Sequence, residues 1–137
     1  MAGPARPFAF LDRDGVLNRD TGYLSRWDQF QFLPGAVQAL HALQGLGYGL
    51  IVITNQSGIA RGLYTEHDYQ RLTTQMLQDL RSQGVRLSAV LHCPHHPEAV
   101  VSAYRVQCLC RKPAPGLIQQ AMHRLPVDLA ASILVGD

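Results

Sequence analysis

Four short apolar runs divide the chain, and they lie at residues 7–12, 48–54, 87–92 and 132–136. The second run, Tyr48-Gly-Leu-Ile-Val-Ile-Thr54, is rich in β-branched residues. The first two runs have no internal polar residue, which is typical of strands that are buried on both faces of a parallel sheet, and the other two runs are short apolar segments of strand length. The pattern therefore predicts four strands of one parallel sheet.

Between these runs, apolar residues recur at helical spacing. The spacing predicts one helix from Pro34-Gly35 to about residue 45, a second from Thr65 to Gly84, and a third after Pro113 and Pro115. Asp68 lies three residues after Thr65 and predicts a variant of the capping box. The expected buried positions are Val37, Leu40 and Leu43, then Tyr69, Leu72, Met76 and Leu80, and then Leu117, Ile118, Ala121, Met122 and Leu125.

Strands that alternate with helices through short loops indicate right-handed βαβ units. The predicted fold class is α/β, a doubly wound Rossmann-like parallel sheet with helices on both faces. At 137 residues, we expect a single domain spanning 1–137. The sequence ends at the fourth strand, so we expect the domain to be incomplete at its C-terminus, with a last strand and helix missing. The segments 18–33 and 93–110 are too short to fold as a separate cap, which predicts a capless site.

Composition narrows the function classes. The chain is 47% hydrophobic and 16% charged, with a formal net charge of +2, which is typical of a soluble globular protein. A charge this small gives no electrostatic reason to expect a nucleic-acid or membrane partner. We find neither a secretory signal at Met1–Pro7 nor an apolar run long enough to span a membrane. We expect a cytoplasmic protein, and a monomer.

Polar side chains follow each predicted strand. Asp12 and Asp14 follow the first strand and are succeeded by Gly15, Thr54 ends the second, and Asp137 follows the fourth. The carboxyl ends of parallel strands meet at one crevice, so these groups should converge there. Carboxylates at i and i+2 leave a strand on the same side, where one could attack or bind a metal while the other moves a proton. The alternatives are a D-x-D-G turn and the start of a calcium loop.

Carboxylates from two strands suit Mg²⁺, which fills its remaining positions with water and phosphate oxygens. Arg111 and Lys112 lie before the third helix, near the same edge of the sheet. Lys112 is the single lysine beside eleven arginines, and its ammonium suits phosphoryl oxygens. The alternative is an ordinary pair of surface cations.

The three cysteines suggest a second site. Cys93 and His95 form a C-x-H pair, and after twelve intervening residues Cys108 and Cys110 form a C-x-C pair. Three thiolates and one imidazole are the ligand set of a closed, structural Zn²⁺ site. An odd number of cysteines argues against a disulfide framework. Three unrelated cysteines are the alternative, and His92 or His96 could compete with His95.

Together these motifs resemble the haloacid dehalogenase superfamily of phosphotransferases. Its four motifs are matched by Asp12–Val16, Ile53–Gln56, Lys112 and Val135–Asp137. Within the superfamily, the chain resembles the heptose bisphosphate phosphatases of bacterial surface-sugar biosynthesis. The segments that carry this closer resemblance are Thr54–Tyr64, Cys93–Pro97 and Cys108–Pro113.

The resemblance implies hydrolysis of the 7-phosphate of D-glycero-D-manno-heptose 1,7-bisphosphate. It makes Asp12 the nucleophile and Asp14 the general acid and base. Mg²⁺ would be held by the Asp12 carboxylate, the Asp14 carbonyl and Asp137, and Thr54 and Lys112 would bind the phosphoryl oxygens. The implied contacts to the sugar phosphate come from Asp20, Thr21, Gly22, Tyr23, Asn55, Gln56, Ser57 and Arg111.

Two other functions stay open from the sequence. One is histidinol-phosphate phosphatase, because that sister family shares the zinc loop, although with a shorter gap between its halves. The other is a non-catalytic fragment that binds a phosphosugar and is held together by zinc.

Overall fold

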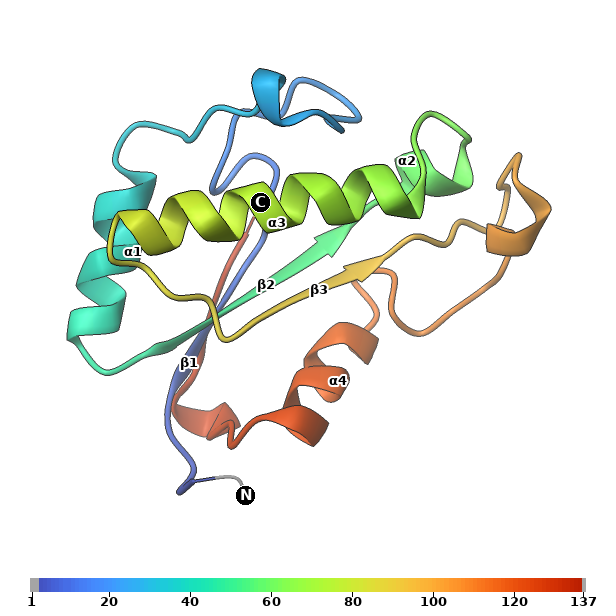
Figure 1. The fold of residues 1–137 in the computed structure, drawn as a ribbon. Helices are drawn as coiled ribbons and strands as arrows, with labels where there is room; N and C mark the ends of the chain where they lie inside the picture. The colour runs from blue at the N-terminus through green and yellow to red at the C-terminus, as the bar shows by residue number, and fades with distance from the viewer. Residues whose placement is uncertain (1–2, 137) are drawn as a thin grey trace.

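A four-stranded parallel sheet forms the centre of the computed structural model, which describes residues 3–136 (Figure 1). The strands are β1 (Phe8–Leu11), β2 (Gly49–Asn55), β3 (Ala89–Cys93) and β4 (Ile133–Val135). Their spatial order is β3-β2-β1-β4, and every pair is parallel. β1 and most of β2 are buried along their length, as expected for central strands that are covered on both faces. The four predicted strands are confirmed.

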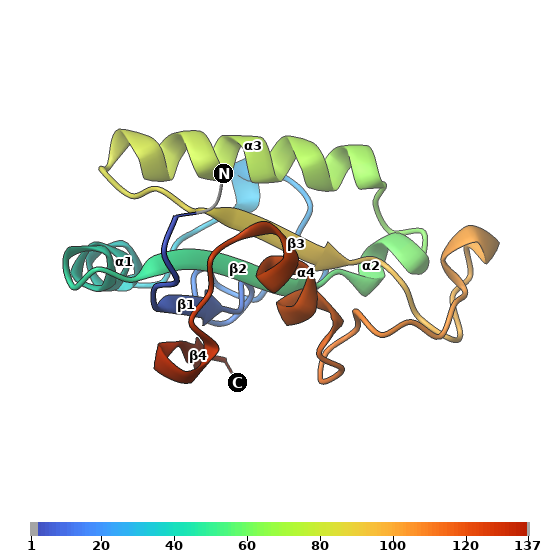
Figure 2. The same ribbon diagram turned by 90° about the horizontal axis from the view of Figure 1, so that it is seen from below.

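Helices cover both faces of the sheet: in Figure 1 two long helices lie above the strands and one lies below them, and Figure 2 shows the strands side by side. α1 (Ala36–Gly45) and α3 (Glu66–Ser82) lie on one face, where Leu40, Met76 and Leu80 pack against alternate strand residues. α4 (Gly116–Arg124) lies on the other face, where Leu117 and Ala121 pack against Phe8, Phe10 and Ile51. This two-sided packing is the doubly wound arrangement that the sequence predicts.

The predicted start of α3 is also confirmed. Thr65 is the N-cap, and its hydroxyl accepts a hydrogen bond from the Asp68 backbone N–H at 3.1 Å. The Asp68 carboxylate accepts one from the Thr65 N–H at 3.0 Å. This reciprocal pair satisfies two of the backbone donors that a helix leaves free at its N-terminus.

One expectation is wrong, and one element was not predicted. Met122 was expected among the buried residues of the last helix, but it is 44% exposed, because α4 packs on the sheet mainly through Leu117 and Ala121. The sequence also gave no sign of a helical turn after β2, where α2 (Ser57–Ala60) forms. A single turn is too short to leave a periodic pattern.

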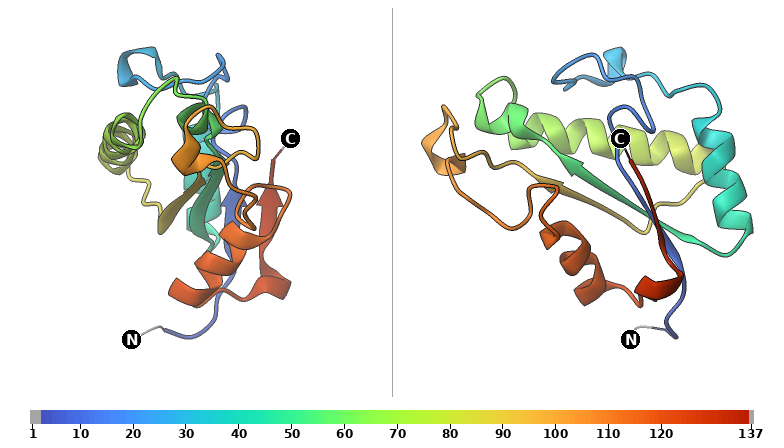
Figure 3. Two further views of the ribbon diagram at one scale, coloured as in Figure 1. Left: turned by 90° about the vertical axis from the view of Figure 1, so that its right-hand side faces the viewer. Right: turned by 180° about the vertical axis from the view of Figure 1, so that it is seen from behind.

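β1 is the point where the chain changes direction across the sheet. β2 and β3 follow on one side of β1, with α1 and α3 on the same face, whereas α4 crosses the opposite face to place β4 on the other side of β1. β4 therefore lies beside β1 although they are far apart in sequence (Figure 3, right). In an open α/β sheet, the crevice at such a switch point is where ligands bind.

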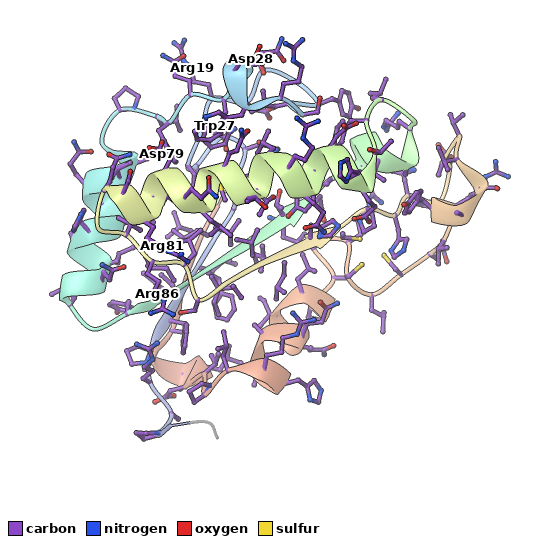
Figure 4. The ribbon with its side chains drawn as sticks, in the orientation of Figure 1. Arg19, Trp27, Asp28, Asp79, Arg81 and Arg86 are labelled. Atoms are coloured by element: carbon purple, nitrogen blue, oxygen red, sulfur yellow. The ribbon has the colours of Figure 1, made fainter. Side chains whose placement is uncertain are left out.

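The segment between β1 and α1 packs down onto the domain. It carries a short 3₁₀ turn at Trp27–Gln29, and Figure 4 shows Trp27 pointing from this turn toward α3. Trp27 stacks on Phe30 with 4.9 Å between ring centroids, and both pack against the core below α3. Within residues 3–136, this segment is a layer over the sheet edge and not a separate cap domain. None of the described helices is both long and apolar enough to cross a membrane.

Candidate active site and metal-binding cluster

Asp12 is the first residue after β1, and its carboxylate faces the Lys112 ammonium. The distance from Lys112 Nζ to Asp12 Oδ1 is 3.0 Å, and each side chain is 24% exposed. Asp12 Oδ1 also accepts a hydrogen bond from the Arg13 backbone N–H at 2.9 Å. Both contacts use Oδ1, so Oδ2 is the oxygen left to meet a phosphorus atom or a cation. A partly exposed charged pair at the end of a buried strand suits a polar ligand.

Lys112 is held in place from β2. Its ammonium donates to the Ile53 carbonyl at 3.1 Å. The Asn55 amide forms two hydrogen bonds with the Lys112 backbone: Asn55 Oδ1 accepts from the N–H at 2.9 Å, and Asn55 Nδ2 donates to the C=O at 3.2 Å. This pairing joins segments 57 residues apart in sequence and fixes where the Lys112 side chain begins.

Asp14 is surrounded by donors. Arg13 Nε and Nη2 lie 3.1 and 3.0 Å from Asp14 Oδ1, and Arg13 Nη2 lies 3.3 Å from Oδ2. Asn18 Nδ2 donates to Oδ1 at 3.0 Å, and Gln56 Nε2 donates to Oδ2 at 3.3 Å. The carboxylate is therefore oriented by three side chains.

The orientation of the Gln56 amide follows from its buried partners. Tyr64 donates its hydroxyl to Gln56 Oε1, and burial raises the pKa of Tyr64, so this hydroxyl keeps its proton. Gln56 Nε2 consequently faces Asp14 and also donates to Thr54 Oγ1 at 2.9 Å. Thr54 Oγ1, which accepts from Gln56, donates its own proton to the Asn55 carbonyl over a long contact of 3.4 Å. A Cβ at Gly58 would lie 2.2 Å from the Tyr64 ring, so only glycine allows this approach.

Two cavities adjoin at Asn55. The first, of about 560 Å³, is lined by Asp12, Asn55, Lys112 and Gly136, among others. The second, of about 360 Å³, is lined by Asp14, Asp20, Gly22, Tyr23, Asn55, Gln56 and Ser57, together with Gly58 and Tyr64. Most of the residues proposed from the sequence to contact the sugar phosphate thus lie around one crevice. Thr21 and Arg111 do not line either cavity; both are exposed, and they are sequence neighbours of the lining residues Asp20 and Lys112. Asp137 lies outside the described residues.

Beyond the end of β3, the three cysteines and one histidine meet. Their ligand atoms all lie within 4.8 Å of one another: the Sγ atoms of Cys93, Cys108 and Cys110 and the Nδ1 atom of His95. The Sγ–Sγ distances are 2.7, 3.2 and 3.3 Å, and His95 Nδ1 lies 3.5 Å from Cys110 Sγ. One ion could contact all four atoms. The competing histidines point elsewhere: His92 pairs with Glu66, and His96 accepts from the Glu98 N–H.

The thiols of this cluster affect one another's protonation. Burial raises the pKa of Cys93, and burial together with the neighbouring thiols raises the pKa of Cys110. Burial acts in the same direction on Cys108, but hydrogen bonds from Cys110 and Cys93 outweigh it and lower the pKa of Cys108 to about 6. Without a cation, ionisation of one thiol makes ionisation of the other two less favourable.

Three residues of the site escaped the sequence-based predictions. Arg13 and Asn18 contact Asp14, and Tyr64 orients Gln56. Arg13 is the one that the sequence could have indicated, because an arginine that follows an apolar run and separates two aspartates is well placed to pair with one of them. Tyr64 ends the segment Thr54–Tyr64 that carries the family resemblance, but the sequence did not indicate what its side chain does.

Comparison with known proteins places the chain in a family. The family model described as Polynucleotide kinase 3 phosphatase matches residues 8–137. The chain is 45% identical over 131 residues to a D-glycero-beta-D-manno-heptose-1,7-bisphosphate 7-phosphatase of Photorhabdus laumondii, and 46% identical over 131 residues to the protein of that name from Escherichia coli K12. These alignments cover 96% of this chain and 70% and 69% of the two relatives.

Solved structures agree with this assignment. A D,D-heptose 1.7-bisphosphate phosphatase from B. bronchiseptica, complexed with magnesium and phosphate, superposes with a TM-score of 0.83 at 35% identity and covers 96% of this chain and 70% of that one. A HAD-like phosphatase from Mesorhizobium loti gives a TM-score of 0.91 at 37% identity, over 99% of this chain and 65% of that one. The chain spans about two thirds of the length of these proteins. It belongs to the haloacid dehalogenase superfamily, in the family of the heptose-1,7-bisphosphate 7-phosphatases.

Proposed function

We propose that this chain hydrolyses the 7-phosphate of D-glycero-D-manno-heptose 1,7-bisphosphate, a step in the supply of bacterial surface-polysaccharide precursors. Relatives that are 45–46% identical carry this activity in their names. The single observation that carries the proposal is the Asp12–Lys112 pair, with 3.0 Å between its charged atoms, at the rim of a cavity beside the sheet's switch point.

The reaction would proceed in two displacements. Asp12 Oδ2 attacks the phosphorus, a new O–P bond forms, and the bond from phosphorus to the sugar oxygen breaks while Asp14 gives that oxygen a proton. A water molecule then attacks the phosphorus and gives its proton to Asp14, and the O–P bond to Asp12 breaks to release inorganic phosphate. Lys112 stays beside Asp12 in both steps and offsets the repulsion between carboxylate and phosphate.

The donor set around Asp12 fits Mg²⁺. Asp12 has one carboxylate oxygen that is not used by Lys112 or Arg13, and oxygen ligands of this kind are those Mg²⁺ prefers. We assign the Asp12 carboxylate, the Asp14 carbonyl and Asp137 as its protein ligands. When bound, Mg²⁺ would neutralise negative charge on the phosphoryl oxygens.

The remaining roles divide between binding and positioning. Thr54 and Lys112 bind the phosphoryl oxygens, and for this the Thr54 hydroxyl exchanges its long 3.4 Å bond to the Asn55 carbonyl for a phosphoryl oxygen. Gln56 is only 2% exposed and both ends of its amide are bonded to protein groups, so we assign it to positioning Asp14 and Thr54 and not to substrate contact. The other proposed substrate contacts are Asp20, Thr21, Gly22, Tyr23, Asn55, Ser57 and Arg111.

We assign Zn²⁺ to the cluster of Cys93, His95, Cys108 and Cys110. Three sulfurs and one nitrogen form a closed tetrahedral set, and such sites are structural. Three thiols this close cannot all ionise in the absence of a cation, so a bound dication removes an electrostatic conflict. The ion would hold the loop 94–107 against the end of β3.

The partner of this enzyme is then a small phosphorylated sugar, bound without a cap domain by a monomeric, cytoplasmic protein. Relatives named for the α and the β anomer of the bisphosphate are 46% and 45% identical to this chain, so assays need both anomers.

The test measures phosphate release from the bisphosphate by the purified chain with Mg²⁺. We expect turnover in the wild type and none above background in Asp12→Asn, which keeps the shape of the side chain but cannot form the phosphoenzyme. Histidinol phosphate and a 3′-phosphorylated oligonucleotide serve as competing substrates. Faster turnover of either one would reassign the substrate, and wild-type turnover in Asp12→Asn would remove the nucleophile from the mechanism.

A further inference from the structure

Arg13 is the most deeply buried charged residue among those described. Its side chain is 1% exposed, although it lies between Asp12 and Asp14, whose side chains are 24% exposed. Burying a guanidinium is costly unless it is paired and hydrogen-bonded. An arginine in this position therefore needs a compensating partner.

That partner is Asp14. Nε and Nη2 of Arg13 reach both carboxylate oxygens, at 3.0–3.3 Å. Within residues 3–136, Asp14 is the only carboxylate that forms an ion pair with Arg13. A planar guanidinium that contacts both oxygens fixes the plane of a carboxylate, which a single ammonium cannot do.

A buried aromatic ring lies near the Arg13 guanidinium. The guanidinium carbon lies 6.0 Å from the centre of the Tyr69 ring, which is 3% exposed and itself stacks on His92 with 4.1 Å between centroids. The Arg13 backbone carbonyl also accepts hydrogen bonds from the N–H groups of Leu17 and Val16, at 2.8 and 3.2 Å. Arg13 is thus fixed at both its side chain and its backbone.

The two oxygens of Asp14 are held unequally. Oδ1 accepts two hydrogen bonds, from Arg13 Nε at 3.1 Å and from Asn18 Nδ2 at 3.0 Å, and Arg13 Nη2 lies 3.0 Å from it as an ion-pair contact. Oδ2 has two donors, and both are at 3.3 Å. Protonation of either oxygen must displace a hydrogen-bond donor from it. The free-energy cost of protonation is therefore lower at Oδ2, where the hydrogen bonds are longer.

We propose that Arg13, which is paired with Asp14 and lies near the Tyr69 ring, is a positioning residue. It anchors Asp14 through Oδ1, so that Oδ2 delivers the proton to the leaving sugar oxygen and later accepts one from water. The inference rests on the proposed function, because it gives Asp14 the acid and base role. In the first step the P–O bond to the sugar breaks as the Oδ2 proton moves to that oxygen, and in the second the proton of the attacking water moves to Oδ2.

The test uses the leaving group to separate positioning from general structural damage. An alkoxide is a poor leaving group and needs the proton from Asp14, whereas p-nitrophenolate leaves without one. In Arg13→Met we expect kcat/KM for the heptose bisphosphate, which reports the first displacement, to fall about 100-fold, the lower end of what general acid catalysis contributes. We expect kcat/KM for p-nitrophenyl phosphate to fall less than about threefold, since its first displacement needs no proton from Asp14. The comparison uses kcat/KM and not kcat, because hydrolysis of the phosphoenzyme draws on Asp14 for both substrates.

A double-mutant cycle makes the test sharper. If Arg13 acts through Asp14, Arg13→Met has no further effect on the bisphosphate reaction once Asp14 is Asn. Arg13→Lys keeps the positive charge but loses the planar guanidinium that contacts both carboxylate oxygens, so we expect an intermediate loss of activity on the bisphosphate. This variant also provides the test if Arg13→Met does not fold. The matched control is Arg71→Met, the same change at an exposed position on α3, which should leave both reactions unchanged.

Equal losses on both substrates, or losses that add to those of Asp14→Asn, would overturn the positioning role and leave the proposed function intact. A different pattern would count against the function itself: either no phosphate release by the wild-type chain, or unchanged turnover in Asp12→Asn. That pattern would overturn the role of Arg13 as well.

Discussion

The carboxylate site at the end of β1 and the thiol cluster at the end of β3 are held together in opposite ways. At the first site, cations and amides surround the acids, so Lys112 pairs with Asp12 and Arg13 with Asp14 before any ligand arrives. At the second site, three thiols and an imidazole face one another, and burial opposes the ionisation of Cys93. At the first site protein cations already compensate each carboxylate, whereas the second site requires a cation to be stable as thiolates.

One segment connects the two sites. Cys110 lies two residues before Lys112, and the Gly116 N–H at the start of α4 donates to the Leu109 carbonyl at 2.7 Å. A Cβ at Gly116 would lie 2.3 Å from that carbonyl oxygen, so the cysteine loop and α4 approach as closely as the backbone permits. A change in the thiol cluster should therefore reach Lys112, whereas a change at Lys112 need not disturb the cluster.

The largest expected effect comes from the metal cluster. With free zinc a thousandfold above its Kd, binding to the native state alone stabilises a protein by about 4 kcal/mol. We expect Cys110→Ser to lose bound zinc and most of this stabilisation, and to lower kcat about tenfold through Lys112, which is about 1.4 kcal/mol. Zinc content by mass spectrometry, thermal unfolding and phosphate release measure the three effects.

The control for this change is Val106→Ser, at an exposed position in the same loop. It should keep zinc, stability and activity. Zinc retained at one ion per chain in Cys110→Ser would contradict the assigned ligand set.

Next in size is Lys112→Met, which removes the cation beside Asp12 and retains the length of the side chain. Loss of one preorganised electrostatic partner of a transition state costs about 10²–10³ in kcat. Zinc content and thermal stability should stay near the wild-type values. Arg124→Met, on the exposed side of α4, is the matched control. A fall in zinc content together with kcat would mean that the coupling between the sites runs in both directions.

Gly58→Ala should have a smaller effect, on the carboxylate site alone. The new methyl group would meet the Tyr64 ring and displace its hydroxyl from Gln56. Overpacking of this kind costs about 1–3 kcal/mol of stability, and kcat should fall because Gln56 no longer fixes Asp14 and Thr54. Gly45→Ala is the control, since a Cβ there meets nothing within 4 Å. Unchanged kcat in Gly58→Ala would show that the Tyr64–Gln56 contact is not needed for the reaction.

Thr65→Ala should have the smallest effect and touch neither site directly. Loss of this N-cap removes the hydrogen bond to the Asp68 N–H and costs about 1 kcal/mol of stability. Neither kcat nor zinc content should change. Thr74→Ala is the control, because Thr74 is exposed within α3 and caps nothing. A fall in kcat would mean that the start of α3 positions Tyr69, and through it Arg13.

The sequence by itself determined the fold class and where the chemistry would gather. Apolar runs and helical spacing depend only on which residues must be buried, so the four strands, the three longer helices and the Thr65 cap could be predicted from local pattern. The meeting of Cys93, His95, Cys108 and Cys110 could be predicted as well, because their spacing leaves few ways for a short loop to bring them together.

Only the tertiary structure decided how the acids are held. That the Arg13 guanidinium lies near the Tyr69 ring and that Asn55 bonds to the Lys112 backbone both depend on contacts between segments far apart in sequence. No local pattern encodes such contacts, because each requires the packing of α3 and α4 on opposite faces of the sheet to be in place first. The same packing explains the exposed Met122, since the close fit of Leu117 and Ala121 against the strands determines which side of α4 is buried.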